Sequence, residues 1–335
     1  SKENHAKSVI YLGNHQNALI DALLIATTTR RKTTFLTRSD VFKNPFVGNF
    51  LKYIGMLPIY RFRDGVDTLS KNTPIFNRCG EVLHDHEAIL IFPEGNHGLK
   101  RRLRPLKKGF VSLLSHRWSI DKQPVYLSPI GVNYIKAVRF PDAASIVYGD
   151  SLKIEPFEIS QENTYSLLAE LHGKLSVLTT HIPESLEVYY DQIETCLEKD
   201  AQLFLNPYKA NDLIAQFEKN LHSNKSGVAA NGELLKGNSA KNFSLFKKAC
   251  SVIFKFLFEC LNMVPLAVWR LFLKPGIKQP EFVSTARFGF SLLFFPCYFL
   301  LMFTLIAVFT KNIGMALAIP MIHFMLNIIF VKKIL

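Results

Sequence analysis

The chain has 335 residues, enough for one large domain or two modest ones. Hydrophobic residues make up 48% of it and its mean hydropathy is +0.13, which argues against an ordinary soluble enzyme and indicates partial embedding in a membrane. The formal net charge of +13 favours nucleic acid, anionic lipid or phosphorylated substrates as partners.

Short apolar runs alternate with helical patterns in the first half of the chain. Strands are expected at residues 8–13, 33–37, 88–92, 125–134 and 144–148, where apolar and β-branched side chains cluster. Helices are expected at residues 18–27, 67–86 and 106–117. This alternation predicts an α/β fold, a mixed sheet flanked by helices, over residues 1–158.

Residues 159–221 change character, because leucines recur there at helical spacing. We expect a helical extension that packs on the sheet. Residues 222–245 are rich in Ser, Asn, Gly and Lys, a composition typical of a flexible linker. Residues 246–335 are apolar and are expected to form a membrane region.

Two segments of this membrane region are long enough to span a bilayer. Residues 288–310 carry no charge over 23 positions, about 35 Å as a helix, and residues 313–331 follow after a short turn. The sequence therefore predicts a C-terminal transmembrane helical hairpin. Lysines and arginines flank it more than its turn, which predicts that the N-terminal part faces the cytoplasm. Residues 246–273 also carry charges, so we expect them to be interfacial or re-entrant.

The cysteines and the start of the chain carry less information. The five cysteines form no Cys-x-x-Cys pair and have no metal-ligand spacing, so reduced thiols facing a cytosol are expected, and no metal site. They are Cys79, Cys196, Cys250, Cys260 and Cys297. The chain begins at Ser1 without a signal peptide, and we expect that its start is trimmed or processed.

His15 and Asp21 are a candidate catalytic pair. They lie six residues apart, which is no helical repeat, but they can meet if His15 is in the turn after the first strand and Asp21 is in the first turn of the following helix. A carboxylate bonded to one imidazole nitrogen raises the basicity of the other. The pair could then take a proton from a substrate hydroxyl that attacks a thioester.

Two further segments follow apolar runs. Arg61 ends the segment that starts at Gly55, and a guanidinium binds phosphate through paired donors. Glu94 and Gly95 follow the strand at 88–92, at the mouth of which polar groups are well placed for a site. Glu94 could bind a hydroxyl or orient a basic group, and Gly95 lets the backbone approach a substrate.

In this order the segments resemble the active site of the lysophosphatidate and glycerol-3-phosphate acyltransferase family. The resemblance covers roughly residues 8–150 and implies an acyltransferase core that uses acyl-coenzyme A or an acyl carrier protein as acyl donor, without a metal or other cofactor. It implies that His15 is the base, that Asp21 is its partner and that Arg61 is a phosphate ligand. The other matching positions are Lys43 ahead of Pro45-x-x-Gly48, Glu94 with Gly95, and Pro129 in a late apolar strand.

The sequence departs from that family at two places. The spacing from His15 to Asp21 is one residue longer than usual, as in a divergent branch of the family. His97 stands where the family usually has Arg, so Arg61, Lys100 or Arg101 is expected to replace the phosphate contact. The predicted substrate-binding residues are Lys43, Arg61, Glu94, Gly95, Asn96, His97, Lys100 and Arg101.

A dense run of cations between residues 100 and 108 is expected to attract anionic lipid, coenzyme A phosphates or an acidic carrier protein. Few aromatic residues interleave with it, so nucleic acid is not expected as a partner. Membrane lipids and the acyl donor are the expected partners. Two alternatives stay open: an acyltransferase for a lyso-aminolipid or other non-phosphate acceptor, and an inactive membrane scaffold that binds lipid. Acyl chain length and oligomeric state also stay open.

Overall fold

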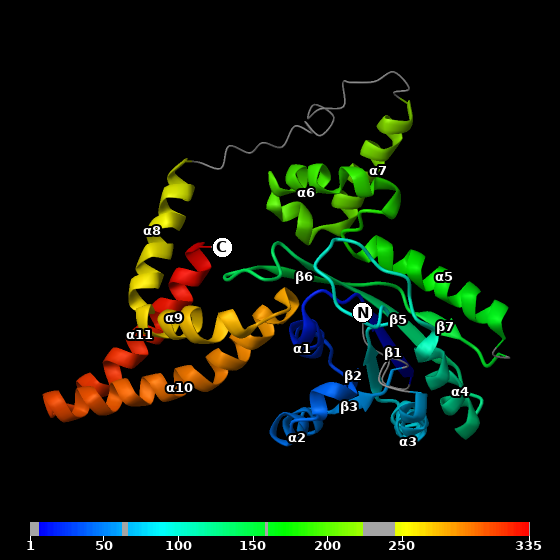
Figure 1. Ribbon diagram of the computed structural model, residues 1–335, viewed down its shortest axis with the longest axis horizontal. Helices are drawn as coiled ribbons and strands as arrows, with labels where there is room; N and C mark the ends of the chain where they lie inside the picture. Colours follow the sequence, from blue (N-terminus) through cyan, green and yellow to red (C-terminus); the bar gives the residue numbers. More distant parts are fainter. Residues whose placement is uncertain (1–6, 62–65, 158–159, 224–244, 335) are drawn as a thin grey trace. The chain divides into compact units, whose positions relative to one another are not determined.

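The computed structural model describes residues 7–61, 66–157, 160–223 and 245–334, which form two compact units (Figure 1). Unit 1 comprises residues 1–16, 20–133 and 144–231, and unit 2 comprises residues 17–19, 134–143 and 232–335. Most of the expected linker, residues 222–245, lies outside the described residues. The domain boundaries expected at residues 158, 221 and 245 therefore stay a prediction.

Unit 1 is built on a seven-stranded sheet with the strand order β3-β2-β4-β1-β5-β6, in which β7 also pairs with β5. The strands are β1 (Ser8–Gly13), β2 (Thr33–Arg38), β3 (Met56–Ile59), β4 (Ala88–Ile91), β5 (Val125–Tyr134), β6 (Ala144–Tyr148) and β7 (Leu152–Ile154). Strands β1 to β5 run parallel, and β7 is antiparallel to β5. The mixed sheet is confirmed, and all five expected strands lie in it.

Helices cover both faces of the sheet, because successive side chains of a strand point to opposite faces and both sets are apolar. Ile10 and Leu12 are fully buried in a core shared with α3 (Asn72–His84), α4 (Val111–Ile120) and α5 (Gln161–Leu178). On the other face, a Cβ atom at Gly13 would lie 3.3 Å from Ile25 of α1 (Ala18–Thr28). Helix α1 therefore packs opposite the other three.

Three short elements have no counterpart among the expected ones: β3, β7 and α2 (Pro45–Tyr53). The two strands have four and three residues, too few for an alternating pattern to show. Helix α2 starts at Asn44, whose side-chain oxygen accepts the N–H of Phe46 at 3.0 Å. Short 3₁₀ turns precede α2, α3 and α4, namely η1 (Ser39–Phe42), η3 (Val66–Lys71) and η4 (Lys108–Phe110).

The helical extension consists of α5 and the helices after it. Leu171 and Leu175 of α5 are fully buried in the core beside the sheet, so the leucine spacing marks the face that packs inward. The remaining elements are η5 (Glu184–Tyr189), α6 (Tyr190–Glu198), η6 (Ala201–Leu205) and α7 (Pro207–Ser223).

Gly131 of β5 lies directly against the end of α5. A Cβ atom at this position would be 1.9 Å from the carbonyl oxygen of Leu178, and a backbone oxygen cannot swing aside as a flexible side chain can. We expect Gly131→Ala to destabilise the protein by about 1–3 kcal/mol or more. Thermal unfolding of the full chain in detergent should show a Tm lowered by several degrees.

The matched control is Gly173→Ala in α5, where an added Cβ meets nothing within 4 Å. Alanine favours a helix over glycine, so this variant should keep or slightly raise the Tm. Equal Tm values for the two variants would contradict the close contact between β5 and α5.

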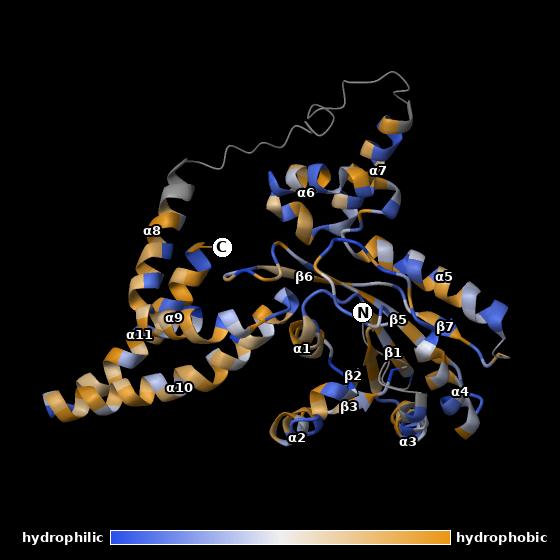
Figure 2. Ribbon diagram, in the orientation of Figure 1, coloured by the Kyte–Doolittle hydropathy of each residue, from blue (hydrophilic) through white to orange (hydrophobic). Residues whose placement is uncertain are grey.

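Unit 2 contains the apolar C-terminal helices α8 (Leu245–Leu261), α9 (Met263–Val268), α10 (Val283–Thr310) and α11 (Ile313–Ile334). Among the described residues, two helical segments are long and apolar enough to cross a membrane: Pro280–Thr310, with a mean hydropathy of 2.5, and Ile313–Ile334, with 2.0. Figure 2 shows both as hydrophobic along most of their length. The segments expected to span at 288–310 and 313–331 thus form two helices of the required length and composition.

The segment expected to be interfacial or re-entrant, residues 246–273, is bent. Cys250–Leu261 and Met263–Gly276 meet at 85°, as in a broken span or a re-entrant loop. Asn262 at the break is buried, and its amide nitrogen donates to the side-chain oxygen of Asn327 in α11 at 2.6 Å. His323 lies 3.3 Å from the side-chain oxygen of Asn262. These polar contacts fix the bend against α11.

Candidate active site

The parallel strands bring the predicted site residues to one edge of the sheet. His15 follows β1, Glu94 follows β4 and Arg61 follows β3, each at the carboxyl end of its strand. Because β1 and β4 are neighbours, the loops with His15 and Glu94 lie side by side. β3 is three strands from β1 in the sheet, which at about 4.8 Å per strand puts Arg61 roughly 14 Å further along the same edge.

His15 and Asp21 form a hydrogen-bonded pair, as the sequence predicted. The Nδ1 atom of His15 is 2.8 Å from Oδ2 of Asp21, and the same oxygen accepts the N–H of Gln16 at 2.8 Å. The Asp21 side chain is fully buried, while that of His15 is 16% exposed. A carboxylate can only accept, so Nδ1 holds the proton and Nε2 is the basic nitrogen. The pair has the geometry of an oriented general base.

The turn between β1 and α1 allows His15 and Asp21 to meet although they are six residues apart. Ala18 adopts a left-handed conformation with φ 40°, which is rare for a residue with a side chain. This sharp change of direction brings the first turn of α1 back toward His15. Such strained backbone is often found where a functional group has to be held in place.

Glu94 connects the loop after β4 to the backbone of His15. Its Oε1 accepts the N–H of His15 at 2.7 Å, and the N–H of Gly98 donates to the carbonyl of His15 at 3.1 Å. The Glu94 carboxylate is buried, with 3% of its side chain exposed. Glu94 therefore holds His15 through its main chain, which agrees with the expectation that it could orient a basic group.

Arg104 holds the other oxygen of this carboxylate. Oε2 of Glu94 accepts from Nε of Arg104 at 2.7 Å and from its backbone N–H at 3.2 Å. The two terminal nitrogens of Arg104 donate to the carbonyls of His97, at 3.2 Å, and Asn96. A planar guanidinium can make these bonds at the same time, whereas an ammonium group cannot match their geometry. Arg104 thus fixes the loop that follows β4.

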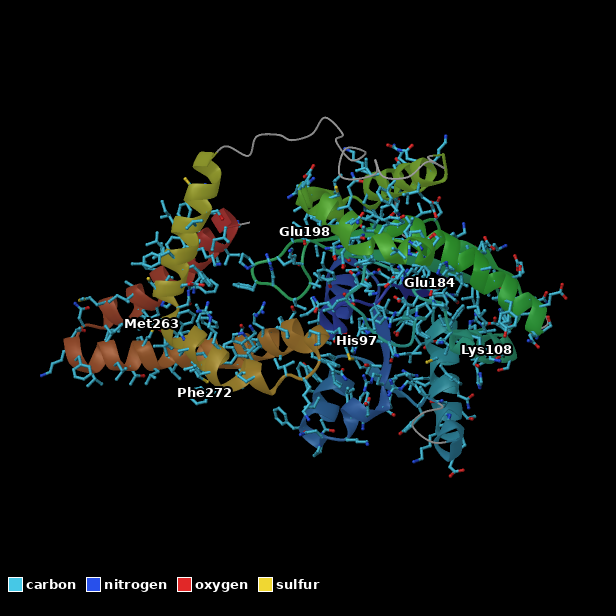
Figure 3. All side chains as sticks on the ribbon, turned by 45° about the horizontal axis from the view of Figure 1, so that its top comes forward. His97, Lys108, Glu184, Glu198, Met263 and Phe272 are labelled. Carbon is cyan, nitrogen blue, oxygen red and sulfur yellow. The ribbon has the colours of Figure 1, made fainter. Side chains whose placement is uncertain are left out.

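Aromatic rings surround the imidazole of His15. Its ring stacks on Phe92, with centroids 4.1 Å apart and planes 9° from parallel. His97, labelled in Figure 3, meets it edge-on at 5.4 Å. Gly95 closes the turn between them with φ 74°, and its N–H donates to the carbonyl of Phe92 at 3.1 Å. The predicted residues Glu94, Gly95, Asn96 and His97 therefore form the loop around His15.

Arg61 and Lys43 lie toward the β2–β3 side of the same edge. A terminal nitrogen of Arg61 is 3.8 Å from Oδ2 of Asp40, and its side chain is 19% exposed. Lys43 ends the turn η1 and is exposed. The structure thus keeps both cations at the predicted edge, with Asp40 orienting the guanidinium of Arg61.

Lys100 and Arg101 are held by the helical extension instead. The Arg101 side chain is 8% exposed, its guanidinium lies 3.5 Å from the ring of Phe204, and its Nε donates to Glu194 at 3.3 Å. Lys100 pairs with Glu187. Both cations therefore hold the chain after the loop to the helical extension.

His181 completes this anchor. Its Nδ1 accepts the N–H of Leu103 at 3.0 Å. Burial, with smaller effects from His172 and Arg102, lowers the pKa of His181 to about 4. The ring is therefore neutral at pH 7, as the acceptor of this hydrogen bond must be.

Sequence reasoning did not assign Arg104 to the site. It stands in a run of cations, and the run as a whole was interpreted as a surface for anionic partners. The sequence offers no local signal for it, although in the structure the buried Glu94 carboxylate requires a nearby cation or several N–H donors.

Residues 1–133 match the model of the family described as Acyltransferase. The chain is 30% identical over 124 residues to the chloroplastic 1-acyl-sn-glycerol-3-phosphate acyltransferase BAT2 of Brassica napus, a match that covers 36% of this chain and 33% of that protein. The chain therefore spans about a third of the length of this curated relative.

Among solved structures, the 1-acyl-sn-glycerophosphate acyltransferase PlsC of Thermotoga maritima matches with 14% identity and a TM-score of 0.35, over 50% of this chain and 65% of that one. A score this low carries no weight for the fold. The match to the Acyltransferase model, however, spans residues 1–133, which include His15, Asp21, Arg61 and Glu94. Over residues 1–133, the chain is therefore similar to acyltransferases.

Proposed function

We propose that this protein is a membrane-bound O-acyltransferase that moves a fatty acyl group from an acyl thioester to the hydroxyl of lysophosphatidate or glycerol 3-phosphate. The observation that carries the proposal is the 2.8 Å bond between His15 and the fully buried Asp21 at the carboxyl edge of the sheet. The family match over residues 1–133 supports it. The donor is acyl-coenzyme A or an acyl carrier protein, and the chemistry calls for no metal or other cofactor.

In this reaction, Nε2 of His15 takes the proton of the acceptor hydroxyl while the hydroxyl oxygen attacks the thioester carbonyl. Asp21 keeps Nδ1 protonated and stabilises the imidazolium that forms. The C–S bond then breaks, and the departing thiolate receives the proton from His15. The products are an acylated glycerolipid and a free thiol. No acyl-enzyme forms, because the acceptor itself supplies the nucleophilic hydroxyl.

The membrane helices suggest where the reaction takes place. Cations gather before and at the start of α10 and at the end of α11, namely Lys274, Lys278, Arg287, Lys332 and Lys333. The turn between the two helices has Lys311 alone. By the positive-inside rule, unit 1 faces the cytoplasm, where acyl thioesters are made, and its lipid substrate lies in the adjoining leaflet.

Thiol release by the full chain in detergent tests this function. The protein is incubated with palmitoyl-coenzyme A and, in separate reactions, with glycerol 3-phosphate, lysophosphatidate or a lyso-aminolipid. Release that depends on one of the phosphate-bearing acceptors supports the proposal and names the acceptor. Absence of release with all acceptors, and with an acyl carrier protein as donor, would leave the scaffold interpretation in its place.

His97 favours a second candidate acceptor, a lyso-aminolipid or another lipid without an accessible phosphate, because the family usually has Arg at this position. Arg61→Ala distinguishes the two. If Arg61 binds the acceptor phosphate, we expect its removal to raise the KM for that acceptor roughly 10- to 100-fold, as the loss of a hydrogen bond to a charged group predicts. The KM for palmitoyl-coenzyme A should change little.

Arg78→Ala is the matched control for this kinetic experiment. Arg78 is also an ion-paired arginine, bound to Glu81 at 2.8 Å, but it lies on the exposed surface of α3. Its removal should leave both KM values unchanged. If Arg61→Ala behaves like Arg78→Ala, the acceptor is not held by a phosphate at this position.

A further inference from the structure

Helix α2 of unit 1 presents large aromatic side chains to solvent. Phe46, Phe50 and Tyr53 are 78%, 45% and 88% exposed. At 3.6 residues per turn these three positions fall within about 60° of one another around the helix axis, and position 48 lies on the opposite side. The buried residues of the helix are Gly48 and Leu51. Helix α2 is thus amphipathic, with its aromatic face turned outward.

Close packing at Gly48 sets this orientation. A Cβ atom there would lie 2.9 Å from the carbonyl oxygen of Phe42 in η1, so the helix approaches the unit through a position that has no side chain. The cap at Asn44 fixes the start of the helix at the same place. With the Gly48 side held against η1, the aromatic residues on the other side have to point away from the core.

The surroundings of the aromatic face are positively charged. Lys43 precedes the helix, and Lys52 lies within it about 130° around the axis from the middle of the aromatic stripe, so that its long side chain has to reach along the flank of the helix. Both lysines are exposed, and the nine helical residues include no Asp or Glu. Aromatic rings flanked by lysines are typical of helices in the membrane interface, where the rings lie among the headgroups and the lysines reach anionic phosphates.

We propose that Phe46, Phe50 and Tyr53, with Lys43 and Lys52, form a docking surface for a bilayer that contains anionic lipid; we call these five residues the α2 face. Among its described residues the same chain carries two helices long and apolar enough to cross a membrane, which makes a bilayer a fitting partner for this chain. A second copy of the chain fits less well. Three aromatic side chains bury at most roughly 450–750 Å², less than the ~800 Å² per partner of a stable interface.

The α2 face lies close in the chain to the predicted phosphate contact of the active site. The helix follows η1, and Asp40 of η1 lies 3.8 Å from Arg61, the proposed contact of the acceptor phosphate. Docking through α2 therefore brings the headgroup layer next to the edge of the sheet at which the acceptor is expected. This consequence rests on the proposed function, whereas the docking itself does not.

Lipid photocrosslinking of the full chain in nanodiscs tests the proposal. Phe46→p-benzoylphenylalanine and Tyr53→p-benzoylphenylalanine place a photoreactive group on the α2 face. Tyr165→p-benzoylphenylalanine in α5, where the native ring is 57% exposed, is the matched control. After irradiation in discs of phosphatidylcholine and phosphatidylglycerol, we expect several-fold more lipid adduct at positions 46 and 53 than at 165, measured by mass spectrometry.

Two further comparisons test the charge. Discs without phosphatidylglycerol, and the added substitution Lys52→Glu, should each lower the adduct yield at position 46 several-fold. Lipid adducts no more abundant at 46 and 53 than at 165 would overturn the proposal, as would crosslinks to a second copy or to another segment of the chain. Thiol release in the same discs is measured in parallel: missing adducts with intact transfer reject the docking alone, and adducts without transfer reject the proposed function alone.

Discussion

Replacing His15 by alanine is expected to lower the turnover of acyl transfer by about 10²–10⁴-fold, the contribution of a positioned general base. The reason is the bond of its Nδ1 to the buried Asp21, which makes Nε2 the proton acceptor. The measurement is thiol release at saturating palmitoyl-coenzyme A and acceptor. The fold should persist, because the imidazole packs mainly on Phe92 and the backbone bonds of residue 15 to Glu94 and Gly98 remain.

A second histidine supplies the control for this prediction. His84 also pairs with an aspartate, its Nδ1 lying 3.0 Å from Oδ2 of Asp121, but the two side chains are 52% and 31% exposed, at the ends of α3 and α4. His84→Ala should leave turnover unchanged. Turnover of His15→Ala close to that of His84→Ala would show that His15 is not the base.

Replacing Arg104 by alanine is the second change with a large expected effect. The Glu94 carboxylate would lose its cation, and the carbonyls of Asn96 and His97 would lose a shared donor. Because Glu94 also holds the backbone of His15, we expect the base to be displaced and kcat to fall roughly 100-fold, the cost of a shift of about 1 Å in a catalytic group. The KM values should change much less than kcat.

Two variants separate this positioning role from a general loss of stability. Arg104→Lys restores the charge but not the forked geometry, so its kcat should lie between those of the native protein and Arg104→Ala. Arg102 is the matched control, because it is bonded to the carbonyls of Ile182 and Pro183 in the helical extension. Arg102→Ala should lower the Tm without a comparable loss of kcat. If both alanine variants lose activity and Tm in parallel, Arg104 acts only through stability.

The pair of His15 and Asp21 and the sheet could both be predicted from the sequence, because both depend on short-range patterns. Apolar runs of four to ten residues marked five of the strands, and parallel strands bring their carboxyl ends to one edge whatever their order. His15 and Glu94 each follow such a strand directly. His15 and Glu94 lie close together because β1 and β4 are neighbours in the sheet.

Arg104 could not be chosen in the same way. Six cations lie between residues 100 and 108. The path of the loop decides which carboxylate each of them contacts, and no local sequence pattern encodes that path. The structure turns Arg104 toward Glu94, and Lys100 and Arg101 toward Glu187 and Glu194. The expectation that either of the last two replaces a phosphate contact therefore finds no support in their position.

The exposed aromatic face of helix α2 could not be predicted, for another reason. Periodicity shows that apolar residues share a face, but it does not show whether that face is buried. In α2 the buried side is defined by Gly48 and Leu51, and the aromatic side is exposed. The two helices that are long and apolar enough to cross a membrane show the opposite case, because a long uncharged stretch identifies them by composition alone.

The place of β1 in the sheet has a consequence for the order in which the protein is made. β1 pairs with β4 and β5, and the side-chain amide of Asn14 at its end both donates to and accepts from the backbone of Val132, 118 residues away. During synthesis His15 and Asp21 leave the ribosome before the strands that pair with β1, of which β4 begins at residue 88 and β5 at residue 125. Pairing over such distances is slow. His15 and Asp21 are thus among the first parts of the domain to be synthesised and among the last to reach their final positions. A nascent chain that ends before β5 carries both residues without the complete sheet that holds them.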